Sequence, residues 1–128
     1  MSTDTLEQIA NHLQFLGYEV TAEANMTRAT HPTRFNFFMR PYAGGILFTT
    51  IFGCSENAKQ DRLGYLDILN SLNNGAAVAR FYADKDSDLL IEAWHPEYYE
   101  RVQFGAFIEA WDRDIRSAAE SGVKEYLR

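Results

Sequence analysis

The chain opens with hydrophobic residues at helical intervals and then changes to an alternation of apolar and polar residues. The apolar positions of the first segment are three or four residues apart: Leu6, Ile9, Leu13 and Leu16. This spacing predicts an amphipathic helix, in which Asp4 and Glu7 have the separation of a capping box and Gly17 marks the end. Residues 18–22 then alternate, which predicts a strand with one solvated face, and residues 25–33 form a polar stretch.

Two aromatic-rich segments, residues 34–40 and 46–52, flank a glycine-containing stretch whose composition is typical of a hairpin turn. They predict two antiparallel strands. Both strands carry apolar residues on both faces, although an antiparallel sheet with one solvated face needs them on one face only. On the first strand Phe38 opposes Phe35, Phe37 and Met39, and on the second Leu47 and Ile51 oppose Ile46, Phe48 and Phe52.

The second half of the chain repeats these signals in a different order. Ser55 is placed to cap a helix whose apolar positions run over residues 63–72 and which stops at the Asn-Asn-Gly sequence that follows. Residues 77–83 and 89–94 predict a second hairpin around an acidic turn. Residues 97–120 carry the strongest helical stripe of the chain and predict a third long helix.

The order of these elements, α-βββ-α-ββ-α, predicts one α+β domain that spans residues 1–128. Strands grouped in hairpins, rather than alternating singly with helices, favour an antiparallel sheet packed with helices.

The net charge and the number of cysteines limit which partners the protein could bind and in which compartment it is expected. A net charge of −6 argues against nonspecific binding to nucleic acid or to anionic membranes, because both depend on clustered cations. No apolar run approaches the roughly 18–20 residues that span a bilayer. The first ten residues are polar and acidic, unlike a signal peptide, and Cys54 is the single cysteine, so we expect a cytoplasmic protein.

The acidic turn between residues 84 and 88 begins like a calcium-binding loop, with Asp at alternate positions. The match fails at Leu89, where such a loop needs glycine, and at His95, where it needs glutamate. We therefore interpret the segment as a solvated hairpin turn.

The remaining reactive side chains show no arrangement typical of an active site. His12, His31 and His95 fall in separate elements without partners at the spacing of a zinc site. A position near the start of a helix would favour the thiolate of Cys54, but no nucleophile motif surrounds it and an inert thiol is favoured. We predict no catalytic residue, no cofactor and no metal site, and hence a protein that is not an enzyme.

Arginine beside aromatic residues offers a different chemistry, because an aromatic sheet surface can stack nucleic-acid bases. Residues 34–38 and 80–82 have this composition. The acidic net charge and the missing ribonucleoprotein consensus weigh against it, so we predict no nucleic-acid partner.

The second helix and second hairpin together resemble the YbjN family of candidate bacterial sensory transduction regulators. The residues that carry the resemblance are Leu66, Leu69, Asn70, Leu72 and Asn73, then Ala79, Arg80, Phe81 and Tyr82, the acidic turn, and residues 89–93. The resemblance implies a fold similar to type III secretion chaperones, which are commonly dimers that hold a partner polypeptide. It implies no catalytic residues, and fold alone does not determine function.

A candidate interface follows from the apolar residues that lie on the opposite face of each strand from the residues expected to form the core. These residues are Phe38, Leu47, Ile51 and Trp94. Our leading hypothesis is a noncatalytic protein-binding domain, chaperone-like or a regulatory adaptor, that forms a homodimer and binds a protein partner of unknown identity. The alternative is a small-ligand-binding regulator or small enzyme with a pocket between the sheet and the third helix. That pocket would be lined by Tyr65, Phe81, Trp94, Phe107 and Trp111.

Overall fold

The structure is a computed structural model that describes residues 3–128. Its helices are α1 (Thr3–Phe15), α2 (Glu56–Gln60), α3 (Arg62–Gly75), α4 (Arg101–Glu120) and the short 3-10 helix η1 (Gly122–Tyr126). Its strands are β1 (Glu19–Ala22), β2 (Thr27–Thr30), β3 (Phe37–Tyr42), β4 (Gly45–Phe52), β5 (Arg80–Ala83) and β6 (Leu89–Pro96).

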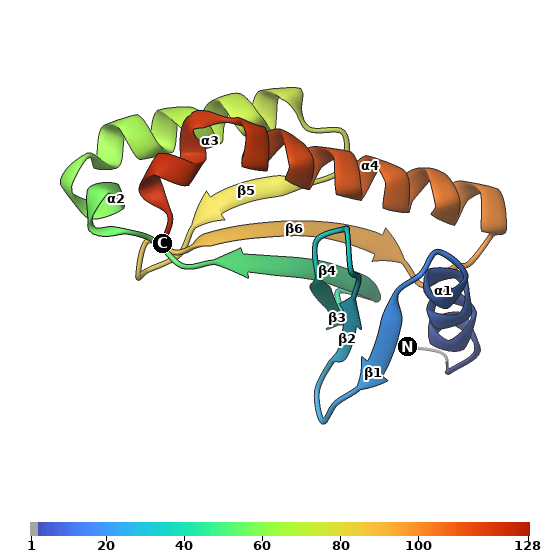
Figure 1. The fold of residues 1–128 in the computed structure, drawn as a ribbon. Helices are drawn as coiled ribbons and strands as arrows, with labels where there is room; N and C mark the ends of the chain where they lie inside the picture. The colour runs from blue at the N-terminus through green and yellow to red at the C-terminus, as the bar shows by residue number, and fades with distance from the viewer. Residues whose placement is uncertain (1–2) are drawn as a thin grey trace.

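The six strands form one antiparallel sheet in the order β1-β2-β3-β4-β6-β5. Helices α3 and α4 lie over one face of the sheet above β5 and β6, and α1 lies beside β1 near the start of α4 (Figure 1). The β1–β2 hairpin runs at a steep angle to β5 and β6, as expected for a twisted sheet. This architecture confirms the predicted α+β class with an antiparallel sheet.

Side chains alternate across β4, and one set builds the core. Phe48 pairs with Met39 of β3 and with Ala93 of β6, so all three point to the face that the helices cover, and all three are buried. Helix α4 supplies Trp111 to the same cluster, with its ring centroid 6.1 Å from that of Phe48. The helical stripe of α4 and the alternation of β4 therefore meet in one hydrophobic core.

Strand β2 lies inside the stretch that we predicted to be polar and without a strand. Thr27 and Ala29 are buried, and Arg28 between them is exposed, so the segment does alternate. The prediction was wrong here because four residues with small or polar side chains give too short a pattern. The pairing of Ala29 with Phe37 of β3 decides the conformation instead.

The predicted second helix is divided in two at Asp61. Its backbone leaves the helical region with φ −120° and ψ 62°, and its carboxylate accepts hydrogen bonds from the Gly64 amide at 3.1 Å and the Tyr126 hydroxyl at 2.7 Å. Asp61 therefore caps α3 and anchors η1. Ser55 precedes α2 as predicted, but its side chain makes no capping hydrogen bond.

The predicted third helix begins at Arg101, four residues later than expected. Pro96 ends β6, and the carboxylate of Glu100 accepts hydrogen bonds from the amides of Val102 at 2.7 Å and Gln103 at 3.3 Å. Glu100 is thus the N-cap, where a carboxylate also suits the helix dipole.

Two side chains close the β5 edge of the sheet. The amide group of Asn73 receives a hydrogen bond from the Phe81 amide at 2.7 Å and donates one to the Phe81 carbonyl at 2.9 Å. The buried carboxylate of Asp114 accepts hydrogen bonds from the amides of residues 77, 78 and 79. These contacts satisfy main-chain groups that would otherwise be open to another strand.

Candidate functional site

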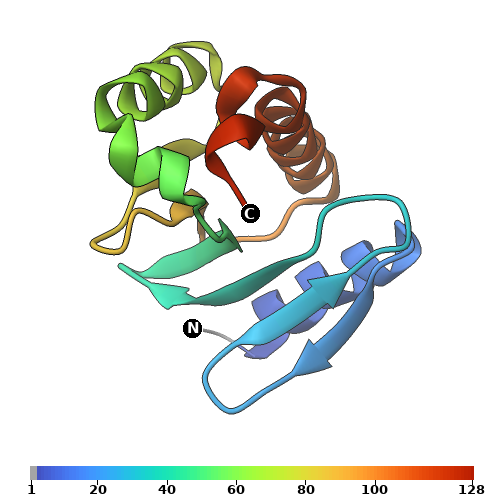
Figure 2. The same cartoon turned by 60° about the vertical axis from the view of Figure 1, so that its left-hand side comes forward.

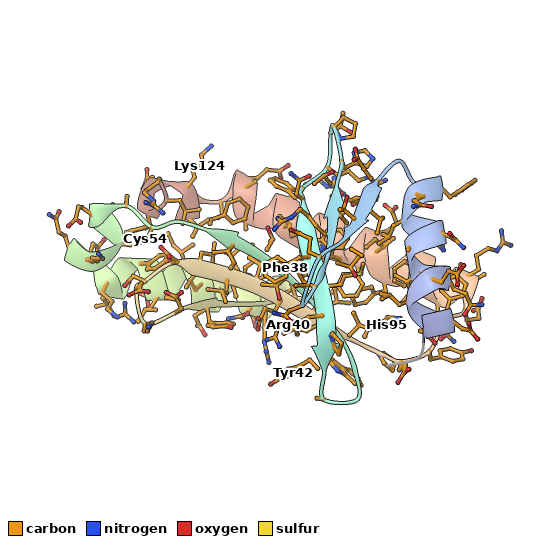
Figure 3. All side chains as sticks on the ribbon, turned by 90° about the horizontal axis from the view of Figure 1, so that it is seen from below. Phe38, Arg40, Tyr42, Cys54, His95 and Lys124 are labelled. Atoms are coloured by element: carbon orange, nitrogen blue, oxygen red, sulfur yellow. The ribbon has the colours of Figure 1, made fainter. Side chains whose placement is uncertain are left out.

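The face of the sheet opposite the helices carries a continuous set of large side chains, which we call the outer face. Its central members are Phe38, Arg40, Tyr42, Leu47, Thr49, Ile51, Arg80, Tyr82, Leu90, Glu92 and Trp94. Figure 3 views the molecule from this side and labels Phe38, Arg40 and Tyr42 along β3. No helix of residues 3–128 covers the sheet on this side (Figure 1).

All four residues of the predicted interface belong to the outer face. Leu47 pairs with Trp94 of β6, Phe38 pairs with Thr49, and Ile51 pairs with Leu90. Ile51 is 50% exposed and Trp94 is 47% exposed, whereas Phe38 is half-buried. The structure thus brings these side chains onto one surface.

Leu47 differs from the other three because it is only 1% exposed. It lies between Arg40 of β3 and Trp94 of β6 in the register of the sheet. Larger neighbouring side chains therefore cover it without a helix above, and Leu47 supports the outer face rather than contacting solvent.

Two further aromatic residues extend this surface: Tyr42, which the sequence assigned to a turn, and Tyr82, which it placed in the strand 77–83 without giving it to this face. Tyr42 and Tyr82 are both more than one-third exposed. The indole Nε1 of Trp94 donates a hydrogen bond to the Tyr42 carbonyl at 2.8 Å, which fixes the indole ring against β3. The alternation of Phe38, Arg40 and Tyr42 along β3 is the signal that could have placed Tyr42 here.

The charged groups of the outer face are unequally paired. Glu92 is buried, and its carboxylate accepts a hydrogen bond from Arg80 Nη2 at 2.7 Å. The pKa of the Tyr82 hydroxyl is raised, first by burial and then by the Glu92 carboxylate. Arg40 stacks on the Tyr42 ring at 5.2 Å and forms no ion pair with any residue in the described range 3–128. The face therefore offers one unneutralised cation among aromatic rings.

The structure places Cys54 beside the acidic turn, where it is poorly suited to act as a nucleophile. Desolvation and the neighbouring Asp88 carboxylate raise the pKa of its thiol. Its Sγ donates to the Asp86 carbonyl at 3.3 Å, and its amide donates to Asp88 Oδ1 at 2.9 Å. Because a thiolate is the reactive form, this environment works against covalent catalysis.

The acidic turn, residues 84–88, is stabilised by hydrogen bonds from its own main-chain amides to one of its aspartate side chains. Asp84 Oδ1 accepts hydrogen bonds from the amides of Asp86 at 2.9 Å and Asp88 at 3.0 Å. These contacts agree with the predicted hairpin turn. Within residues 3–128, no group of three or more His, Cys, Asp or Glu side chains is arranged to hold a metal ion.

Each of the three histidines joins two elements, and His12 and His95 pack against the same Phe104 ring. His12 Nδ1 of α1 lies 2.9 Å from the Tyr99 hydroxyl, which joins α1 to the segment before α4. His31 Nδ1 accepts from the Thr33 amide, and its Nε2 lies 3.1 Å from the Leu16 carbonyl, which ties α1 to the loop before β3. His95 is buried against Phe107, and burial lowers its pKa.

The residues proposed for an alternative pocket do not line a common cavity. Tyr65, Phe81 and Trp111 are buried in the hydrophobic core, and Phe107 packs against it. Trp94 points to the outer face on the other side of the sheet. The grouping was wrong because the alternation of β6 sends Trp94 away from α4.

None of the helices in residues 3–128 combines the length and the apolar character needed to cross a bilayer.

Comparison with known proteins supports the fold and gives no sequence relative. No family model matches the chain, and no curated protein matches it. Among solved structures it is similar to the crystal structure of YbjN from E. coli, a candidate transcription regulator, with a TM-score of 0.74. The two share 16% sequence identity, and the alignment covers 100% of this chain and 96% of that one. The predicted likeness to YbjN is confirmed at the level of fold, and similarity to the secretion chaperones stays a prediction.

Proposed function

We propose that this chain is a noncatalytic protein-binding domain, chaperone-like or a regulatory adaptor, that acts in the cytoplasm and binds a partner protein with its outer face. The observation that carries this proposal is the uncovered sheet face with Ile51, Trp94, Tyr42 and Tyr82 exposed on it. Large exposed apolar patches mark interaction sites, and Tyr, Trp and Arg dominate the binding energy of interfaces.

The pairing of charges indicates the chemistry of the partner. Arg80 is neutralised by Glu92, whereas Arg40 has no ion pair within residues 3–128. A partner surface that presents apolar groups around a carboxylate would bury the aromatic rings and neutralise Arg40. A second copy would bring another Arg40 to the same region, so charge favours a different protein on this face.

The test of this site is the replacement Ile51→Asp. Because the side chain at position 51 is half exposed, the carboxylate of the new aspartate stays solvated and the variant keeps its fold. An apolar partner surface would have to remove water from that carboxylate, which costs binding free energy. We expect the partner recovered with the tagged wild-type chain to bind the purified variant at least about tenfold more weakly. Titration calorimetry with that purified partner measures the change.

The matched control is Leu63→Asp on α3. Leu63 is 74% exposed and lies outside the outer face, so the substitution adds the same charge elsewhere. Binding should match the wild type. Equal loss in both variants, or none in Ile51→Asp, would contradict the assignment of the outer face.

We also propose that the chain forms a homodimer, through a surface other than the outer face. Phe15 at the end of α1 is 86% exposed, and Val102 at the start of α4 is also exposed. Phe15 lines a surface cleft together with Arg101, the residue next to Val102 in the sequence. Sedimentation equilibrium should show a dimer that Phe15→Glu dissociates and Ile51→Asp leaves intact. A dimer dissociated by Ile51→Asp would give the outer face to a second copy instead.

A further inference from the structure

An apolar cleft lies on the helix-covered side of the molecule, between the end of α4 and the loop that joins β2 to β3. Its volume is about 230 Å³, and Phe35, Phe52, Ile115, Ala119, Lys124 and Arg128 are among its lining residues. Figure 2 shows the end of α4 and η1 over β4, beside that loop. We call it the Lys124 cleft.

The walls of the Lys124 cleft are aromatic and its back is aliphatic. Phe35 and Phe52 meet edge to face with ring centroids 6.2 Å apart, and Ile115 is buried behind them. Ala119 is small and exposed, so α4 leaves open a space that a larger residue would fill. Apolar walls with few polar groups are typical of small-molecule sites.

Two cations stand at the rim of this apolar space. Lys124 and Arg128 are exposed, and neither forms an ion pair with any residue of the range 3–128. The pKa of Asp88 is lowered first by the Cys54 amide and also by Arg128, so this carboxylate partly offsets the Arg128 charge. Arg128 is held in place, because its amide donates to the Gly53 carbonyl at 2.9 Å. The guanidinium lies over Gly53, where an added Cβ would overlap it. On a chain of net charge −6, this end of the cleft attracts an anion locally.

The volume limits the size of the apolar body. An engineered apolar cavity of ~150 Å³ in another protein holds benzene, so a cleft of about 230 Å³ has space for such a ring and a short side arm. We infer that the Lys124 cleft binds a small amphipathic monocarboxylate, with its apolar body between Phe35 and Phe52 and its carboxylate at Lys124 and Arg128. The site is on the opposite side of the sheet from the outer face, so it stands independently of the proposed protein partner.

The experiment uses three probes with one apolar body and different charges: 3-phenylpropionate, 3-phenylpropanol and 3-phenylpropylammonium. Two-dimensional NMR titration of the full chain reports both the affinity and the residues affected. We expect the carboxylate to shift signals of Phe35, Phe52 and Lys124. It should bind roughly three to ten times more tightly than the alcohol, since exposed ion pairs contribute modestly, and the ammonium should bind least.

Two variants separate the charge from the shape of the site. Lys124→Glu should weaken the binding of 3-phenylpropionate on the order of tenfold, and the variant should no longer prefer it over 3-phenylpropylammonium. Ala119→Phe should fill the cleft and abolish binding of all three probes, while thermal unfolding verifies that the variant is folded. Arg113→Glu makes the same change from cation to anion at an exposed position of α4 that does not line the cleft, and it should leave the carboxylate affinity unchanged.

Several outcomes would overturn the inference. Equal affinity for all three probes would mean that the cations do not select an anion. No shift of cleft signals at the highest soluble probe concentration would mean that the site takes no such ligand. A peptide ending in a phenylalanine carboxylate that binds while free 3-phenylpropionate does not would assign the cleft to a protein terminus.

Discussion

The two faces of β4 are built from the same kinds of residue but have different environments. Phe48 on one face is buried under α4, whereas Ile51 on the other face is 50% exposed with no helix above it. The difference shows that hydrophobicity along a strand does not reveal which face becomes core. The covering element decides it, and here α4 covers one face only (Figure 1).

The largest expected difference comes from truncating one residue on each face. Phe48→Ala should lower the free energy of unfolding by about 3–5 kcal/mol, because it leaves a cavity beside Trp111. Ile51→Ala should change it by less than about 1 kcal/mol. Urea denaturation of both variants measures the contrast. Similar losses from the two would mean that something covers the outer face in the isolated chain.

The next largest effect on the unfolding free energy is expected at Asp114 of α4, on the helix-covered side of the sheet. Asp114→Ala should cost about 2–4 kcal/mol of unfolding free energy, because the amides of residues 77–79 lose their acceptor. The exposed Glu109 on the same helix is the control, and Glu109→Ala should cost less than about 1 kcal/mol. Hydrogen exchange of these amides should accelerate in Asp114→Ala alone, and unchanged exchange would contradict the anchoring role.

Leu47 sharpens the comparison because it belongs to the outer face and is nevertheless buried. We expect Leu47→Ala to lower the unfolding free energy by about 2–3 kcal/mol, closer to a core residue than to Ile51. The same denaturation series provides the measurement. A loss below about 1 kcal/mol would show that Arg40 and Trp94 do not cover this side chain in solution.

The smallest expected effect is the pH dependence conferred by His95 on the covered side. Burial lowers its pKa below the ordinary value of 6.5, so the unfolded chain takes up a proton first as the pH falls. This contribution to stability is complete above about pH 6.5 and is lost as the pH decreases from there toward the folded-state pKa. Thermal unfolding between about pH 8 and about pH 5 should show a shallower slope for His95→Gln than for the wild type. Identical slopes would contradict the lowered pKa.

Much of the fold follows from patterns along the sequence, because long periodic segments report burial directly. The stripe on α4 and the alternation of β3, β4 and β6 predicted their elements and the four interface residues on one face. Strand β2 and the break at Asp61 could not be predicted, because each depends on contacts with distant residues, Phe37 for the strand and Tyr126 for the break.

The apolar residues of the outer face could be predicted from the sequence, but its charge pairs could not. The alternation of β4 placed Leu47 and Ile51 opposite the core. The exposed fraction of each side chain depends on the neighbouring strands, so the sequence could not predict that Leu47 is buried. The pairing of Arg80 with Glu92 and the lack of a partner for Arg40 require the strand register. The Lys124 cleft combines residues of β4, α4 and η1 with a loop, and no local pattern joins them.

The most direct test of the outer face is photo-cross-linking in the native cell, with benzoylphenylalanine placed at Ile51 and, as a control, at Leu63. Both positions are exposed, so the two proteins should fold equally well. We predict that the chain with the cross-linker at Ile51 forms one discrete product, in which it is joined to a single protein whose mass differs from its own. This product should disappear when the same chain also carries Arg40→Glu. The cross-linker at Leu63 should give no such product. No product from Ile51, or the same product from both positions, would contradict the proposal that this face binds a partner.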